Sequence, residues 1–143
     1  MMNRRQFLQH TAAGLALGAI PLPLRAAESQ ISLGFSLYGM KSLPVADALK
    51  VCAEIGYRNV ELTLMPGYPT EPKLLSLADR RALRESLAQH RLSVSGLMDN
   101  LSLVADDAAH AKNLDRIKAA AELAHTLAPD QPPILESVLG GKS

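Results

Sequence analysis

The sequence predicts an α/β protein whose parallel sheet is built in the order βαβαβαβ. From Ile31 onward, apolar residues recur alternately every second residue, as in a strand, and about every 3.6 residues, as in a helix. The helical segments are long enough to carry the chain back to a parallel neighbouring strand. Four strands and three helices are therefore expected.

The first two elements are a strand over residues 31–38 and a helix that ends before Gly56. In the strand, apolar residues alternate with small or polar ones. In the helix, Val45, Leu49 and Cys52 recur at helical spacing, and the glycine is suited to the turn that follows a helix. Cys52 is the only cysteine, so we interpret it as a buried structural thiol.

The second strand is expected over residues 59–65. Val60, Leu62 and Leu64 lie on one face of this segment, and Glu61 lies on the other. Several prolines and glycines then force the chain into a loop.

The next helix and strand follow that loop. Ser76 and Asp79 resemble a capping box that opens a helix through about residue 90. Leu83 and Leu87 form the apolar side of this helix, and the third strand runs over residues 92–98.

The last helix and strand complete the pattern. Asp106 is suited to cap a long helix that stops before Pro129, and the fourth strand covers residues 134–139. The apolar stripe of the helix is expected to hold Leu114, Ile117, Ala121 and Ala124.

Two parallel architectures fit this order: a doubly wound open sheet and the first half of a (β/α)₈ barrel. Strands buried between two helix layers are nearly continuously apolar. Here polar side chains, including Ser36 and Glu61, share one face of each strand. This alternation favours the half barrel, whose interior is partly polar near its mouth.

The first 26 residues resemble a twin-arginine export signal. Arg4 and Arg5 precede a mildly apolar run, and small residues at Ala26 and Ala27 offer a cleavage site. The run is too short and too rich in glycine and proline for a spanning helix. The sequence therefore predicts export through the twin-arginine translocase to the periplasm or cell envelope, with residues 27–143 as the folded part. An ordinary secretory signal is the alternative.

The charge balance excludes some partners. The chain carries 15 basic and 14 acidic residues, and they are scattered along it. A nearly neutral chain gives no electrostatic reason to expect nucleic acid or anionic membranes as partners.

Three stretches resemble the sugar phosphate isomerase/epimerase family of xylose isomerase-like barrels. They are residues 33–39, with the sequence LGFSLYG, residues 55–62, with IGYRNVEL, and residues 134–141, with ILESVLGG. The combination of glycine, aromatic residue, valine and glutamate that ends at Glu61 is the most diagnostic piece. The resemblance covers the folded part of this chain but only the first half of the family's barrel.

The resemblance implies an enzyme that interconverts an aldose with a ketose or an epimer. In that family a divalent metal (Mn²⁺, Mg²⁺ or Zn²⁺) assists proton transfer, and its ligands lie on later strands that this sequence does not include. No metal ligand can therefore be numbered here, and this chain alone is expected to be inactive. The implied partner is a small sugar or a sugar phosphate.

Glu61 is the first candidate for catalysis, because a carboxylate facing a barrel interior needs a cation, a metal or a substrate hydroxyl. A structural hydrogen-bonding role is the alternative. Glu136 is the second candidate, although alternation does not decide whether it or Leu135 and Ser137 face inward.

Four further residues are candidates for substrate binding: Ser36, Tyr38, Asp99 and His110. The first three lie at or just after strand ends, where loops build barrel sites. Tyr38 could instead pack at the end of the barrel. His110 lies in the first turns of the third helix, where a packed or capping role is the alternative.

Two other functions stay open. One is an exported barrel relative that binds a sugar without catalysis. The other is a complete open-sheet α/β module of unrelated function. A half barrel would leave two strand edges unpaired, so self-association is also expected.

Overall fold

The computed structural model describes residues 31–102 and 106–137. The predicted signal and the last two residues of the predicted fourth strand lie outside these ranges. The chain divides into two units, Met1–Ile31 and Ser32–Ser143, and the elements below belong to the second. They are β1 (Gly34–Ser36), α2 (Val45–Ile55), β2 (Asn59–Thr63), α3 (Leu77–Gln89), β3 (Ser93–Asp99), α4 (Asp107–Leu127) and β4 (Ile134–Ser137), with short 3₁₀ helices η1 (Leu37–Met40) and η2 (Pro72–Leu74).

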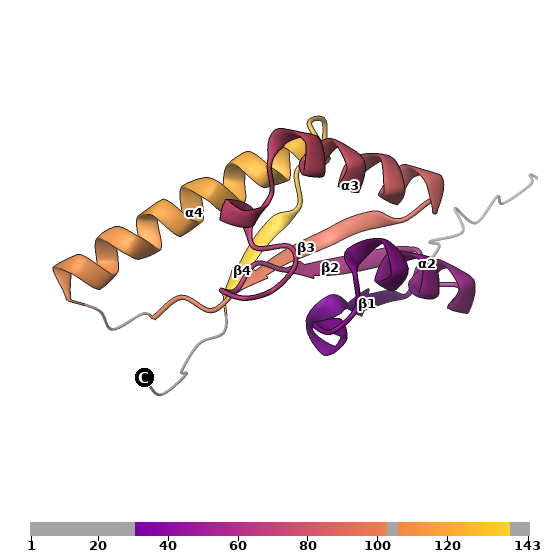
Figure 1. Ribbon diagram of the computed structural model, residues 1–143, viewed down its shortest axis with the longest axis horizontal. Coiled ribbons are helices and arrows are strands. Elements are labelled where there is room, and N and C mark those ends of the chain that lie inside the picture. The colour runs from indigo at the N-terminus through magenta and orange to yellow at the C-terminus, as the bar shows by residue number, and fades with distance from the viewer. Residues whose placement is uncertain (1–30, 103–105, 138–143) are drawn as a thin grey trace, which may run out of the picture. The chain divides into compact units, whose positions relative to one another are not determined.

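The four strands form one parallel sheet in the order β1-β2-β3-β4 (Figure 1). The predicted alternation of strands with helices is therefore confirmed. Each strand lies beside the one before it, so the described sheet grows in a single direction. None of the described helices is both long and apolar enough to span a membrane.

One face of the sheet is covered by all three α-helices. A single buried cluster joins apolar side chains of the strands to those of each helix. Its fully buried members include Leu49 and Cys52 of α2, Val60, Leu62 and Leu97 of the strands, and Leu123 of α4. The opposite face, which we call the open face, has no described helix packed on it. Burial raises the pKa of the Cys52 thiol, which fits the structural role expected for it.

The predicted helix ends are confirmed. Ser76 accepts a hydrogen bond from the Asp79 amide, and the Asp79 side chain accepts one from the Ser76 amide, so α3 opens on a complete capping box. Asp106 accepts a hydrogen bond from the Ala109 amide and caps α4. Gly56 ends α2 at φ 103°, a left-handed conformation that favours glycine.

The first strand is shorter than predicted. Strand β1 stops at Ser36, whose hydroxyl accepts a hydrogen bond from the Tyr38 amide at 3.3 Å. This cap starts η1, so residues that alternate as a strand in the sequence turn into a helix instead. Local hydrogen bonding by serine competes here with extension of the strand.

The predicted stripe of α4 is wrong at three of its four positions. Leu114, Ile117 and Ala121 are exposed, whereas the buried positions are Ala120, Leu123, Ala124 and Leu127. Only the second half of α4 lies along the sheet, and the first half projects beyond it (Figure 1). The helix is therefore longer than the surface available to bury it.

A bulge in β3 decides which side chains share a face. Val60 pairs with Val94, but the next residue, Glu61, pairs with Gly96, so Ser95 is left outside the register. The Ser95 hydroxyl donates to the Val60 carbonyl at 3.3 Å. Beyond the bulge, Leu97 faces the helices and Met98 faces away from them. Regular alternation from Ser93, without a bulge, would place these two side chains on the opposite faces.

Candidate functional site

Two carboxylates and a serine lie on the open face of the sheet. Ser36, the last residue of β1, is in register with Glu61, and Glu61 is in register with Gly96. Glu136 lies on the same face because it is in register with Met98, two residues beyond Gly96. The structure thus brings together three of the predicted site residues: Ser36, Glu61 and Glu136.

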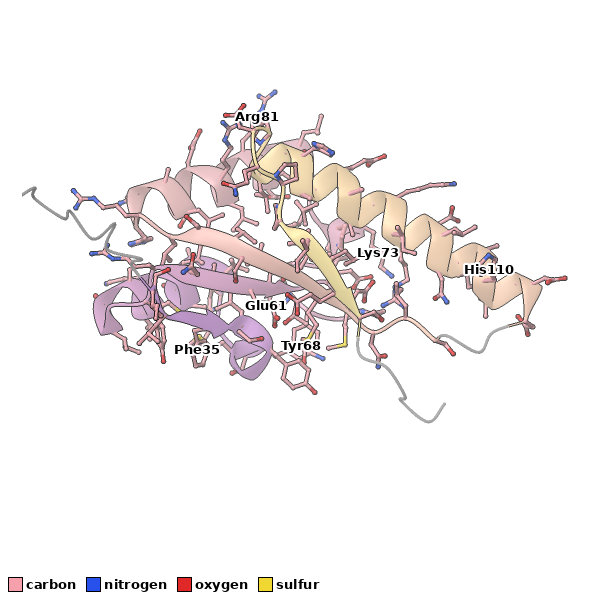
Figure 2. All side chains as sticks on the ribbon, turned by 180° about the vertical axis from the view of Figure 1, so that it is seen from behind. Phe35, Glu61, Tyr68, Lys73, Arg81 and His110 are labelled. Carbon is pink, nitrogen blue, oxygen red and sulfur yellow. The ribbon has the colours of Figure 1, made fainter. Side chains whose placement is uncertain are left out.

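Glu61 is held by a short hydrogen bond. The Ser36 hydroxyl donates to Oε1 at 2.5 Å, which joins the end of β1 to the centre of β2. The second oxygen, Oε2, makes no hydrogen bond within the described ranges. A half-buried carboxylate with one oxygen fixed and one free is suited to accept a hydrogen bond or a proton from a ligand. Figure 2 shows Glu61 near the middle of the sheet.

Glycine at position 96 leaves room for the two carboxyl side chains. A Cβ atom placed there would lie 2.5 Å from Oε1 of Glu136 and 3.8 Å from Cγ of Glu61. Both side chains therefore lean over the same residue of β3. The face that alternation left undecided for Glu136 is the open one, and Leu135 and Ser137 lie on the helix side.

Asp99 does not join this group. Its carboxylate is buried and bonds Arg116 of α4 through two guanidinium nitrogens, with Nε 3.0 Å from Oδ2. The Asn100 amide donates to Oδ1 at 2.9 Å. Because of the bulge at Ser95, Asp99 faces the helices, and its hydrogen bonds tie the end of β3 to α4.

Of the two remaining candidates, Tyr38 is connected to Glu61 only through the Ser36 hydroxyl among the described contacts, and His110 lies apart. Tyr38 is exposed in η1, beyond the end of β1. His110 is exposed in the first turn of α4, and Figure 2 shows it near the end of that helix that projects past the sheet. No described contact connects His110 to the open face.

A buried glutamate in the loop after β2 was not predicted. Glu71 accepts a hydrogen bond from the Gly67 amide at 2.8 Å, and Lys73 Nζ lies 2.7 Å from its Oε1. Burial by itself raises the pKa of Glu71. The Lys73 and Gly67 hydrogen bonds, with the charges of Lys73 and Arg116, outweigh burial and hold that pKa below its usual value. The carboxylate fixes this loop beside α4, and no sequence motif marks it.

Thr63 carries an unpaired buried hydroxyl on the open-face side of β2. The residue is 1% exposed, and its Oγ1 has no hydrogen-bond partner in the described part of the chain. By contrast, the neighbouring Thr70 hydroxyl donates to the Thr63 carbonyl at 2.7 Å. The two threonines thus form a matched pair, in which the Thr70 hydroxyl has a hydrogen-bond partner and the Thr63 hydroxyl has none among the described residues.

We expect Thr63→Val to leave the free energy of unfolding unchanged or to raise it by up to about 1 kcal/mol, because valine removes an unpaired hydroxyl at similar volume. Thr70→Val, the matched control, is expected to lower it by about 1–2 kcal/mol. Urea denaturation followed by circular dichroism measures both. A larger loss for Thr63→Val than for Thr70→Val would mean that the Thr63 hydroxyl has a partner.

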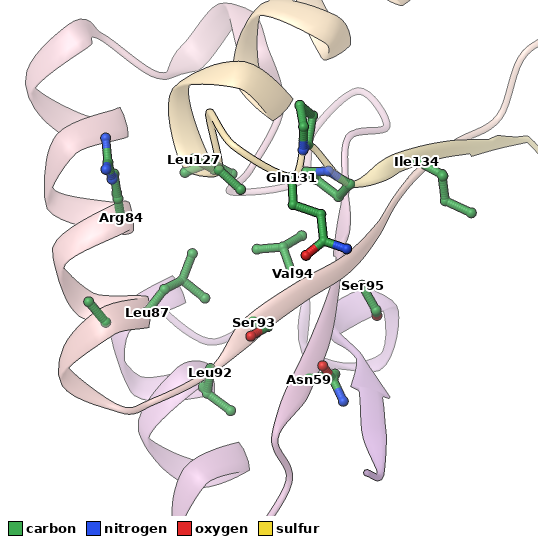
Figure 3. Close-up of a pocket in the computed structure, with 14 residues that line it drawn as sticks. Asn59, Arg84, Leu87, Leu92, Ser93, Val94, Ser95, Leu127, Gln131 and Ile134 are labelled. Atoms are coloured by element: carbon green, nitrogen blue, oxygen red, sulfur yellow. The ribbon is translucent and has the colours of Figure 1, made fainter. Parts of the chain in front are cut away.

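A groove of about 640 Å³ lies at the other end of the sheet (Figure 3). It is bounded by Leu87 of α3, Val94 of β3 and Leu127 of α4. Its strand residues are at the amino ends of β2, β3 and β4, whereas ligand sites of parallel α/β sheets lie at the carboxyl ends. No Asp or Glu is among the described residues that line the groove, so the open face is the better candidate for a site with acid or base groups.

The family resemblance implies a divalent metal, which requires several donor side chains that converge on one point. Within residues 31–102 and 106–137, no three His, Cys, Asp or Glu side chains converge to hold an ion. Glu61 and Glu136 supply two carboxylates, fewer than the three protein ligands of a catalytic zinc site. The described residues therefore do not complete a metal site, and no step below depends on a metal.

Comparison of the chain with protein-family models gave no match, and comparison with curated proteins gave none either. The function is therefore inferred from the geometry of the open face and from the resemblance of the three sequence stretches.

Proposed function

We propose that this chain provides half of a (β/α)₈ barrel that acts on a small sugar or sugar phosphate as an isomerase or epimerase. The observation that carries the proposal is the pair of glutamates, Glu61 and Glu136, that lean over Gly96 on the open face. A pair of carboxylates on one face can remove a proton from a carbon beside a carbonyl and return it elsewhere.

The topology supports a barrel rather than a doubly wound sheet. A doubly wound sheet reverses its strand order and carries helices on both faces. Here the strand order is sequential, and all described α-helices pack on one face. In a closed barrel the open face would become the interior, and the free edges of β1 and β4 would be paired.

Each residue of the open face has a distinct part in this proposal. Ser36 orients Glu61 by donating to Oε1, so that Oε2 points to the substrate as the proton acceptor. Glu136 lies on the neighbouring part of the same face and would supply or accept the second proton. The helix-side residue Asp99 serves the stability of the site and not the reaction.

The direct experiment incubates the complete barrel protein, of which this chain would form half, with a panel of aldoses, ketoses and their phosphates. Conversion is followed by proton NMR in deuterium oxide, with and without added Mn²⁺ or Mg²⁺. We expect one substrate to be converted and to take up deuterium at the carbon beside the carbonyl. Absence of conversion and of deuterium uptake under all conditions would contradict the enzyme proposal.

A sugar-binding protein without catalysis is the second candidate, because the polar groups of Ser36, Glu61 and Glu136 on one face are also suited to hydrogen-bond sugar hydroxyls. It predicts saturable heat of binding with a panel sugar by calorimetry and no product. Conversion of that sugar would exclude this candidate.

Export to the periplasm or cell envelope is part of the proposal and rests on Arg4 and Arg5. We expect Arg4→Lys/Arg5→Lys to leave the precursor in the cytoplasm, because the twin-arginine translocase reads the arginine pair. Immunoblots of periplasmic and cytoplasmic fractions measure this outcome. Arg80→Lys/Arg81→Lys, a second adjacent pair on α3, is the control and should not affect export. Normal export of the first variant would contradict the twin-arginine assignment.

A further inference from the structure

Two tyrosines and a lysine form an ordered cluster at the carboxyl ends of β1 and β2. The Tyr38 and Tyr68 rings are stacked, with centroids 5.7 Å apart and planes inclined by 20°. Nζ of Lys41 lies 4.6 Å from the centroid of the Tyr68 ring. We call these three residues the tyrosine platform; Tyr68 is labelled in Figure 2.

The local sequence explains why the platform is ordered. Ser36 caps η1 and so turns the chain at the point where Tyr38 must leave the strand. Gly67 adopts φ 79°, and a Cβ atom at this position would lie 3.5 Å from Lys41 Nζ. The Tyr68 amide then donates to the Met65 carbonyl at 3.1 Å, which closes the turn under the ring. Stacking and turns thus fix the side chains before any ligand arrives.

The platform presents an exposed aromatic ring and an ammonium group to solvent. Tyr38 is 54% exposed, although its ring is held by Tyr68. Lys41 is exposed and forms no ion pair with a carboxylate in the described part of the chain. Burial, the charge of the neighbouring Tyr38 and a hydrogen bond with it raise the pKa of Tyr68. The exposed Tyr38 ring and the Lys41 ammonium group both contact Tyr68, which joins them into one cluster.

The platform adjoins the site on the open face. The Ser36 hydroxyl accepts a hydrogen bond from the Tyr38 amide and donates one to Glu61 Oε1. Ser36 therefore links the platform to the Glu61 carboxylate. Both lie at or near the strand ends where parallel sheets bind ligands. A ligand bound to Tyr38 would also lie near Glu61.

We propose that the tyrosine platform binds the anionic end of a sugar that carries a phosphate or a carboxylate group. The apolar C–H face of the sugar ring rests on Tyr38, and the anionic group pairs with Lys41. This inference rests on the proposed function, because it names the substrate class of the same site. It makes Tyr38 a binding residue and adds Tyr68 and Lys41, which the sequence did not single out.

The chain has only three tyrosines, so fluorine NMR can follow each of them separately. The protein is labelled with 3-fluorotyrosine, and its three fluorine resonances are assigned with Tyr→Phe variants. Tyr57, whose ring packs against Phe35 at 5.3 Å between centroids, is the internal reference. Glucose 6-phosphate, glucuronate, glucose and inorganic phosphate are titrated separately.

We expect glucose 6-phosphate or glucuronate to shift the resonances of Tyr38 and Tyr68 saturably while Tyr57 is unchanged. Glucose should bind more weakly. Lys41→Met should weaken binding of the anionic sugar about tenfold, the effect of losing one charge-assisted contact, without affecting glucose. Lys50→Met, on the exposed side of α2, is the matched control and should change neither.

Other outcomes would overturn the inference. Equal shifts with inorganic phosphate alone would mean a simple anion site without sugar recognition. Equal affinity for glucose and its phosphate would exclude the role of Lys41. Conversion of a panel sugar with no shift of Tyr38 or Tyr68 would reject the platform and leave the proposed function intact. Binding at the platform without any conversion would reject the enzyme and leave the platform intact.

Discussion

Arg116→Met is expected to lower the free energy of unfolding by about 3 kcal/mol. The Asp99 side chain is only 3% exposed, and methionine would leave its carboxylate buried without a cation. We place the loss at the lower end of the range for broken buried pairs because the Arg116 side chain is 31% exposed. Urea denaturation at pH 7 measures it.

Two further variants separate the ion pair from the general loss of charge on α4. Lys118→Met removes an exposed cation of the same helix and should change stability by less than about 0.5 kcal/mol. Asp99→Leu/Arg116→Met replaces both partners by apolar groups and should recover much of the loss. If Arg116→Met were as mild as Lys118→Met, Asp99 would not depend on Arg116.

In the complete barrel, the proposed enzyme role predicts that Glu61→Gln reduces kcat by about 10²–10⁴-fold, the usual contribution of a general base. Glutamine still offers an oxygen to the Ser36 hydroxyl, so the hydrogen bond between β1 and β2 is kept while the proton acceptor is lost. The free energy of unfolding should therefore change little. Steady-state rates by NMR and urea denaturation measure the two effects.

Glu54→Gln is the matched control for this variant. Glu54 is an exposed residue of α2 with only a distant lysine partner, so neither rate nor stability should change. A normal kcat for Glu61→Gln would contradict a catalytic role of Glu61. A loss of stability in proportion to the loss of activity would instead support its alternative, a structural hydrogen-bonding role.

The sequence was sufficient for most of the fold because local signals agree with tertiary structure. Serine and aspartate caps, the glycine after α2 and the alternation around Glu61 each have a short-range physical cause. The errors arose where a tertiary effect prevails. Only half of α4 has a sheet to cover, so Leu114 and Ile117 are exposed despite their helical spacing.

The candidate site was less predictable because it depends on which face of the sheet each strand residue occupies. One extra residue, Ser95, turns Asp99 toward the helices and brings Gly96 to the open face. No composition signal marks such a bulge. Glu136 could be placed only through its register with Met98, since β4 reads equally well on either face. Tyr68 contacts Tyr38 and Lys41, which are distant in sequence, whereas Gly67 and Lys73 hold Glu71 in a loop without a periodic pattern.

The central claim is that sugar binds on the open face at the carboxyl ends of the strands. The most direct test is a titration of ¹⁵N-labelled protein with the panel sugar that is converted fastest. We predict the largest amide shifts at Ser36, Glu61 and Met98 and in the loops that follow these strands. Shifts confined to the groove between Leu87 and Leu127, with the carboxyl ends unchanged, would contradict the claim.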